Sequence, residues 1–359
     1  MTEQQQPLSI VPYLKLAVEK DASDLFFTAS SPVMIKINGE IHPVGKTPMT
    51  SEIIRKLAYS MLSEEQQEEY EQALELDFAS NAGGMGRFRV NLFHQRGRCS
   101  MVLRYVKNDV PELDGLGLPD SLKDLIMHKR GMLLMVGATG SGKSTTLAAM
   151  INHRNKHSTG HILTIEDPIE FLHPNHNCIV NQREVGQDTL SYERALHSSL
   201  REAPDVILIG EIRARETMDS CIQLAGTGHL SISTLHANNA YQTLQRIINM
   251  YPDEMRAQLY MDLSLNLRAV ISQRLVKKKD GGRTAAVEVM VCTPYIQELI
   301  LKGQIDDIRE AMAESSDSAM QTFDDSLYRL YQEGVIELEE ALNNADSRTN
   351  LETRINFGG

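Results

Sequence analysis

The sequence lacks several features that would assign it to whole classes of protein. It has only four cysteines and no C-x-x-C pair, which fits neither a zinc site nor a disulfide framework, so we expect reduced, buried thiols. Its longest apolar runs, such as Met132–Val136, are far too short to cross a bilayer. The first residues, Met1–Pro7, have neither the basic nor the apolar region of a signal peptide.

An excess of positive charge is also missing. The chain has 36 Lys and Arg against 48 Asp and Glu, a formal net charge of −12. Binding duplex DNA by counterion release needs clustered basic residues, so this balance argues against a nucleic-acid partner. The 359 residues, 42% hydrophobic and 23% charged, allow two domains that each bury a core. We therefore expect a cytoplasmic protein of two domains without a transmembrane segment.

The first part of the chain, residues 1–108, is predicted to form a small α/β domain. Apolar residues alternate over 33–37, and Asn38-Gly39 then gives the signal of a two-residue hairpin turn. Ser63-Glu-Glu-Gln66 has the spacing of a capping box and predicts the start of a helix. Residues 87–106 read as a second hairpin that turns at Gln95-Arg-Gly97-Arg.

Residues 109–119 hold two prolines and two glycines without periodicity, which predicts a linker before a second domain over 120–359. There, short apolar runs alternate with helical stretches, as expected for a parallel sheet covered by helices. A long helix is predicted over 252–275, more helices follow to about 342, and the last 17 residues look polar and frayed. The predicted strands are 132–136, 162–165, 206–209 and 230–235, and the predicted helices between them are 121–130, 143–153, 191–201 and 214–224.

The strongest chemical signal is a phosphate-binding loop, G-x-x-x-x-G-K-[ST], between a predicted strand and a predicted helix. Glycines let backbone N–H groups curl around a phosphate, and the helix N-terminus adds partial positive charge. Lys143 would bridge the β and γ phosphates of ATP, and the Ser144 hydroxyl would bind Mg²⁺. The competing interpretation is a glycine-rich turn without a ligand. The predicted nucleotide-binding residues are Gly137, Ala138, Thr139, Gly140, Ser141, Gly142, Lys143, Ser144 and Thr145.

Two apolar runs end in carboxylates. The run 205–211 ends in Glu211, the arrangement of a Walker B strand whose acid acts on Mg²⁺ or its waters. The run 161–165 is followed by Glu166-Asp-Pro-Ile-Glu170. Glu166 is the best candidate for a general base that orients the attacking water, but a solvated turn explains this segment equally well.

Two further groups have a structural and a functional interpretation. His229 and His236 lie at the two ends of a predicted strand, where a structural histidine is the default and a γ-phosphate sensor the alternative. Arg87 and Arg89 leave one face of a predicted strand, with Arg104 on its partner. A solvated strand face explains them, whereas an arginine finger would add about 10³- to 10⁵-fold in rate.

Together these motifs closely resemble the secretion and type IV pilus ATPase superfamily, in particular its pilus-retraction branch, the PilT and PilU ATPases. The resemblance covers nearly the whole chain, with several long motifs in the right order. They are the N-terminal signature 21–25, the arginine strand Arg87-Phe-Arg-Val-Asn91, the Asp box Ile162–Phe171, the Walker B segment Gly210-Glu-Ile-Arg213, and the His box from Thr227-Gly-His229 to Thr234-Leu-His236.

The resemblance implies a PAS-like α/β N-terminal domain and a RecA-like P-loop ATPase domain. It implies that Glu166, Glu211, His229, Arg89 and Arg104 are catalytic, that His236 belongs to the same site, and that Ser144 and Glu211 bind the metal. Less directly, it implies roles for Arg201 and Arg213. It also implies a homo-hexamer with ATP and Mg²⁺ between subunits, a PilT-like partner, and a platform protein in the inner membrane that holds the ring at the base of the pilus.

One departure points to the accessory retraction ATPases, the PilU type. Where PilT sequences carry Arg-Asn after a Thr-Pro, this chain has Gln297-Glu298, which reverses the local charge. That difference leaves open a nucleotide-dependent scaffold that assists a partner motor. A pilus extension or type II secretion ATPase is a further alternative, but those proteins usually carry a tetracysteine metal site, and the cysteines here are scattered.

Overall fold

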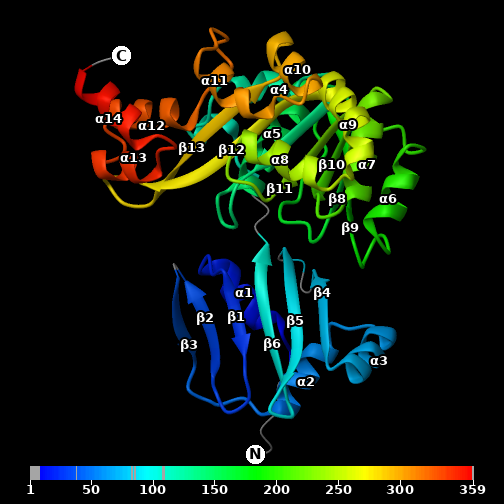
Figure 1. Ribbon diagram of the computed structural model, residues 1–359. Coiled ribbons are helices and arrows are strands. Elements are labelled where there is room, and N and C mark those ends of the chain that lie inside the picture. Colours follow the sequence, from blue (N-terminus) through cyan, green and yellow to red (C-terminus); the bar gives the residue numbers. More distant parts are fainter. Residues whose placement is uncertain (1–8, 38, 82–83, 85, 107–109, 358–359) are drawn as a thin grey trace, which may run out of the picture. The chain divides into compact units, whose positions relative to one another are not determined.

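The computed structural model describes residues 9–37, 39–81, 84, 86–106 and 110–357. The chain divides into two compact units, Met1–Asp109 and Val110–Gly359 (Figure 1). No helix among the described residues is long and apolar enough to span a membrane. Asn38 and residues 108 and 109, which belong to the predicted turn and domain boundary, lie outside the described part.

The first unit is an antiparallel sheet with helices packed on it. Its strands pair in the order β3-β2-β1-β6-β5-β4, and the predicted hairpins correspond to β2–β3 and β5–β6. The capping box is confirmed, since Ser63 accepts from the Gln66 N–H and the Gln66 side chain accepts from the Ser63 N–H. The elements are α1 (Val11–Glu19), β1 (Asp24–Phe27), β2 (Val33–Ile37), β3 (Glu40–Val44), α2 (Ser51–Tyr59), α3 (Glu64–Ala73), β4 (Glu75–Ser80), β5 (Arg87–Gln95) and β6 (Arg98–Val106).

The second unit is built on a mostly parallel sheet in the order β13-β12-β7-β11-β10-β8-β9, with β13 antiparallel at its edge. The elements are η2 (Leu113–Gly115), α4 (Ser121–Ile126), β7 (Gly131–Val136), α5 (Lys143–His157), β8 (Gly160–Glu166), β9 (Cys178–Glu184), α6 (Tyr192–Ser199), β10 (Val206–Glu211), α7 (Arg215–Gly226), β11 (Leu230–Leu235), α8 (Ala240–Asn249), α9 (Asp253–Asn266), β12 (Leu267–Lys277), β13 (Arg283–Val291), α10 (Pro294–Leu301), η3 (Ile305–Asp307), α11 (Ile308–Ala313), α12 (Phe323–Gln332), α13 (Leu338–Asn344) and α14 (Arg348–Phe357).

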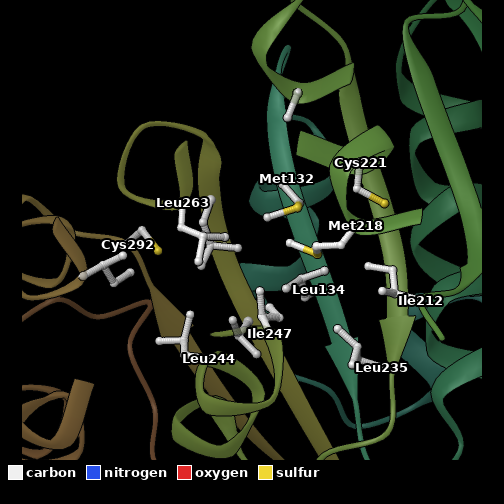
Figure 2. Packing of buried hydrophobic residues seen from close by; sticks show 14 of the residues in the cluster. Met132, Leu134, Ile212, Met218, Cys221, Leu235, Leu244, Ile247, Leu263 and Cys292 are labelled. Atoms are coloured by element: carbon white, nitrogen blue, oxygen red, sulfur yellow. The ribbon is translucent and has the colours of Figure 1, made fainter. Parts of the chain in front are cut away.

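The central strands are buried on both faces, as their unbroken apolar runs predict. On β7, Met132 and Leu134 pack into one core cluster, whereas Leu133 and Met135 pack into another on the opposite face. Figure 2 shows the first cluster, in which helices α7, α8 and α9 cover the sheet with residues such as Met218. This double burial confirms the mixed α/β fold. Because β7, β11, β10 and β8 run parallel, their carboxyl ends lie along one edge of the sheet.

Several predicted boundaries are wrong. The helix over 252–275 ends at Asn266, because Leu267–Lys277 forms β12 and pairs with β7 and β13. Strands β9 and β13 were not predicted, and the helix over 121–130 ends at Ile126. Short apolar runs of this kind suit a helix or a strand, and pairing with neighbouring strands determines which one forms.

The expected frayed tail also differs from the structure. Residues 348–357 form α14, whose Leu351 is buried in a cluster with α12 and α13, and Arg354 pairs with Asp325 at 2.6 Å. Within the expected linker over 109–119, Leu113 is buried in the core of the second unit. In each segment a buried apolar residue, Leu351 or Leu113, packs a largely polar stretch against a hydrophobic core.

Candidate active site

The P-loop connects the end of β7 to the start of α5. Gly142 is the N-cap of α5, with a φ of +86°, and no side chain caps the helix. A cap-free N-terminus leaves its backbone N–H groups available to an anion. A Cβ at Gly137 would lie 2.5 Å from the carbonyl oxygen of Gln273, so glycine is needed there for close packing. The motif predicts that a phosphate binds at this cradle.

Lys143 lies on the P-loop with its amine folded back onto the loop. Its Nζ donates to the carbonyl oxygens of Gly137 and Ala138, at 2.7 and 2.9 Å. Burial lowers the pKa of Lys143, and the carboxylates of Glu211 and Glu170 oppose that shift. The structure thus brings Lys143 and Glu211 into one electrostatic environment, while Ser144 and Thr145 lie half-buried on the first turn of α5.

Glu211 ends β10 just after a bulge that redirects the strand. The register with β11 shifts between Ile209 and Glu211, and the hydroxyls of Ser233 and Thr234 donate to the carbonyl oxygens of Ile209 and Gly210, at 2.7 and 2.6 Å. Bulges of this kind re-aim side chains at the end of a strand. The sequence pattern of the Walker B strand does not reveal this device.

Both oxygens of the Glu211 carboxylate have cationic or titratable partners. His236 Nε2 lies 3.1 Å from Oε1, and Arg213 Nε donates to Oε2 at 2.8 Å. Each carboxylate oxygen keeps a second lone pair, so in the predicted metal pair of Ser144 and Glu211 the carboxylate could bind Mg²⁺ or one of its waters beside these partners. No group of three or more His, Cys, Asp or Glu residues that could hold a metal occurs within the described ranges. A site of few protein oxygens nevertheless suits Mg²⁺, which keeps several waters and phosphate oxygens as ligands.

Glu166 ends β8, the neighbour of β10 in the sheet. The Thr164 hydroxyl donates to its Oε1 at 2.6 Å, and the Gln182 amide donates to the same oxygen at 3.2 Å. Burial raises the pKa of Glu166, and these two donors partly offset the increase. A Cβ on Gly210 would lie 3.4 Å from the Glu166 Cα, so the two strand ends are closely packed. Gln182 comes from β9, which was not predicted.

The two histidines lie at opposite ends of β11. His236 follows β11 and contacts Glu211, whereas His229 precedes it, and its carbonyl oxygen accepts from the N–H of Gly131, where β7 begins. The six residues of β11 put about 20 Å between them. His229 Nδ1 lies 3.1 Å from the Leu224 carbonyl oxygen. The structure therefore does not place His229 beside the P-loop of its own chain, because motif adjacency in sequence spans the full length of a strand.

The predicted arginines belong to the first unit. Arg89 and Arg104 face each other across β5 and β6, both exposed, and line a pocket with Asp24, Asp77 and Asn91. Arg104 Nε donates to Asp24 Oδ1 at 2.9 Å, and the Asp24 side chain is only 6% exposed. A buried carboxylate thus anchors a guanidinium that points to solvent. In the second unit, Arg201 is exposed just after α6.

Pockets flank the P-loop on two sides. One is lined by Gly137, Ala138, the segment 236–238 and polar side chains of α8 such as Arg246. The other is lined by residues 137–141 together with Asn238, Arg274 and Asn344 from distant parts of the chain. The loop therefore has open space beside it, as nucleotide binding requires. The four cysteines are all buried and free, as expected.

Comparison with known proteins agrees with this geometry. The family model for type II/IV secretion system proteins matches residues 3–343. The type IV pilus ATPase PilU of Pseudomonas aeruginosa is 51% identical over 96% of this chain and 91% of its own length. The type IV pilus retraction ATPase PilT of the same organism is 40% identical over 93% and 97%. A crystal structure of the pilus retraction motor PilT with bound ADP, 40% identical, superimposes with a TM-score of 0.90 over 96% of this chain and 99% of that one. The chain therefore belongs to the type II/IV secretion system protein family, as a PilT/PilU-type ATPase.

Proposed function

We propose that this protein is an ATP-hydrolysing motor that powers type IV pilus retraction and so twitching motility. The observation that carries the proposal is the convergence of Lys143, Glu166 and Glu211 at one edge of the sheet, in a chain similar along its length to PilU and PilT. Similarity to PilT with bound ADP supports nucleotide binding. The Gln297-Glu298 departure from the PilT pattern supports a PilU-type, accessory motor.

The site suggests a role for each group. The N–H groups of 137–145 and the Lys143 amine would bind the ATP phosphates. Ser144 and Glu211 would hold Mg²⁺, which would neutralise charge on the phosphate oxygens. Glu166, with its raised pKa, accepts a proton from the attacking water. His236 touches Glu211 and lines the pocket beside the loop, so it is better placed than His229 to respond to the γ-phosphate.

The arginines suggest that a complete site needs two subunits. Arg89 and Arg104 lie on the first unit of the chain, apart from the elements that build the P-loop. In a homo-hexamer, a neighbouring subunit would supply these two arginines to the nucleotide, so the site would be complete only in the assembled ring. The ring would work at the cytoplasmic face of the inner membrane, against a platform protein and beside a PilT-like partner.

A scaffold that turns over little ATP is a second candidate, favoured by one feature of α10. Glu298 is exposed and pairs with Lys302 at 2.5 Å, and Gln297 is half-buried beside it. The charge reversal in this segment thus lies at the surface, where it changes partner contacts rather than the core. An extension or type II secretion ATPase remains the less favoured alternative, because the described cysteines form no metal cluster.

The ATPase rate of the purified protein, alone and with a PilT-like ATPase, separates these candidates. A motor hydrolyses ATP by itself and loses that activity in Lys143→Ala, whereas a scaffold shows turnover only when the partner is present. Unchanged hydrolysis by Lys143→Ala would contradict both candidates, the motor and the scaffold, because each needs the P-loop to bind ATP.

Mixing two inactive variants tests the shared site. Lys143→Ala retains its arginines, and Arg104→Ala retains its P-loop, so mixed rings should recover part of the wild-type rate. If mixing restores nothing while each variant still assembles, Arg104 acts within its own chain or not at all.

A further inference from the structure

A buried glutamine of β12 joins the P-loop to the central sheet. Gln273 is only 2% exposed. Its amide Nε2 donates to the carbonyl oxygen of Ser141 at 2.8 Å, and its Oε1 accepts from the Thr146 hydroxyl at 2.7 Å. One side chain therefore ties together the second half of the loop and the first turn of α5.

The chemistry of the two contacts fixes the orientation of the amide. The Ser141 carbonyl can only accept a hydrogen bond, so it requires the NH₂ end of Gln273. The Thr146 hydroxyl is then left to donate to the oxygen end, and Thr146 is itself only 2% exposed. Removing either donor would leave a buried acceptor without its partner, which is expensive in the interior.

The glycines of the motif fit closely around this glutamine. A Cβ on Gly142 would lie 2.7 Å from Gln273 Nε2, and one on Gly137 would lie 2.5 Å from the Gln273 carbonyl oxygen. These glycines therefore allow the loop to approach the glutamine as well as a ligand. The sequence motif places them but does not show what they pack against.

Gln273 and Lys143 bind different parts of the loop, Gln273 the carbonyl of Ser141 and Lys143 the carbonyls at its start. Lys143 Nζ donates to the carbonyls of Gly137 and Ala138, and those bonds compete with any phosphate that the same amine binds. Gln273 borders the pocket beside residues 137–141 but is only 2% exposed, and it donates to a carbonyl oxygen for which a phosphate does not compete. Its bond to Ser141 can therefore persist when a phosphate is present. Glycine-rich loops lose much conformational entropy on ordering, and a persistent tie reduces what binding must supply.

We propose that Gln273 is a positioning residue that holds the P-loop in its phosphate-binding conformation through Ser141 and Thr146. The inference rests on the proposed ATP function of the loop and adds a residue that the motif does not contain. Without the tie, only a fraction of molecules has the loop in the binding conformation, and the apparent Kd rises by the inverse of that fraction. We expect nucleotide binding to weaken about 5- to 100-fold, the equivalent of one lost hydrogen bond that leaves a buried carbonyl unpaired.

The test compares Gln273→Leu with a chemically matched control on the wild-type full-length protein. Asn155 Nδ2 also donates to a backbone carbonyl, that of Pro174, at 2.7 Å, and Asn155 is fully buried near the C-terminal end of α5, about 20 Å along the helix from Gly142. Each variant is titrated with mant-ADP, its KM and kcat for ATP are measured, and its thermal midpoint is recorded. Gln273→Leu should raise Kd and KM together, whereas Asn155→Leu should lower the thermal midpoint without changing either.

Gln273→Glu separates the two ends of the side chain. It keeps the acceptor for Thr146 but places an oxygen against the Ser141 carbonyl, so it should bind mant-ADP as weakly as Gln273→Leu. Wild-type affinity in Gln273→Leu or Gln273→Glu would overturn the inference. Failure of the wild-type protein to bind mant-ADP would instead overturn the proposed function.

A second pair of variants decides the matter if Gln273→Leu does not fold. Thr146→Val removes the hydroxyl that donates to Gln273 Oε1 but keeps the β-branched shape, and Thr146→Ser keeps that hydroxyl. We expect Thr146→Val to bind mant-ADP at least several-fold more weakly than Thr146→Ser. Equal affinity of these two variants would contradict the proposed tie.

Discussion

The ionisation of Glu166 offers a sharp test of its proposed role as general base. The Thr164 hydroxyl donates to its carboxylate at 2.6 Å and so favours the charged form. Thr164→Val keeps the β-branched shape in the middle of β8 but removes this donor. Burial already raises the pKa of Glu166, and loss of the hydroxyl must raise it further.

The magnitude follows from the strength of a hydrogen bond to a charged group. Such bonds contribute about 1.5–3 kcal/mol, and one pKa unit corresponds to about 1.36 kcal/mol, so the pKa should rise by about 1–2 units. A base must be deprotonated to act, so activity is lost as the pH falls through its pKa. The acidic limb of the kcat/KM profile should therefore move to higher pH by about 1–2 units.

The assay is the steady-state ATPase rate from pH 5 to 9. Thr243→Val is a matched control, because its buried hydroxyl donates to the Asn239 carbonyl oxygen at 2.8 Å and touches no site carboxylate. Its profile should superimpose on that of the wild type. If the Thr164→Val profile also superimposes, then Glu166 is not the group whose deprotonation governs the reaction.

Three further predictions concern other parts of the second unit. Burial raises the pKa of Glu288 to about 7 from an ordinary 4.5, so the folded state holds a proton that the unfolded state has lost, and stability should fall by about 3 kcal/mol as the pH rises from 4.5 through 7. Glu288→Gln keeps an acceptor for Ala240 and Ser272 and should flatten this dependence in urea unfolding at pH 5 and 8; an unchanged slope would refute the assignment, and exposed Glu339→Gln is the control. Gly142→Ala should weaken mant-ADP binding by at least about tenfold, because its Cβ would meet the Gln273 amide in a left-handed conformation, whereas Gly281→Ala, with a φ of +93° and open space around it, should bind normally; equal affinities would contradict the packing argument. Leu351→Ala should lower the free energy of unfolding by about 2–5 kcal/mol, since Leu351 is 1% exposed, while Phe357→Ala, 83% exposed, should have little effect; a neutral Leu351→Ala would restore the view that the tail is frayed.

Much of the fold and half of the site could be predicted from the sequence because they depend on local patterns. The capping box at Ser63 and the P-loop at 137–144 are encoded within a few residues, and the apolar run of β7 predicts burial on both faces. Since parallel strands end at one edge of a sheet, Glu166 and Glu211 could be expected near the P-loop without coordinates. These inferences need spacing and strand direction alone.

Only the tertiary structure decided which distant residues complete the site. Residues 267–277 have apolar spacing that suits a helix, and pairing with β7 and β13 makes them a strand. That pairing places Gln273 behind Ser141, 132 positions away in sequence. The same holds for Gln182 beside Glu166, and for the separation of His236 from His229 by the length of β11. Strand order and the ends of strands are properties of the assembled sheet, and no local pattern in the sequence carries them.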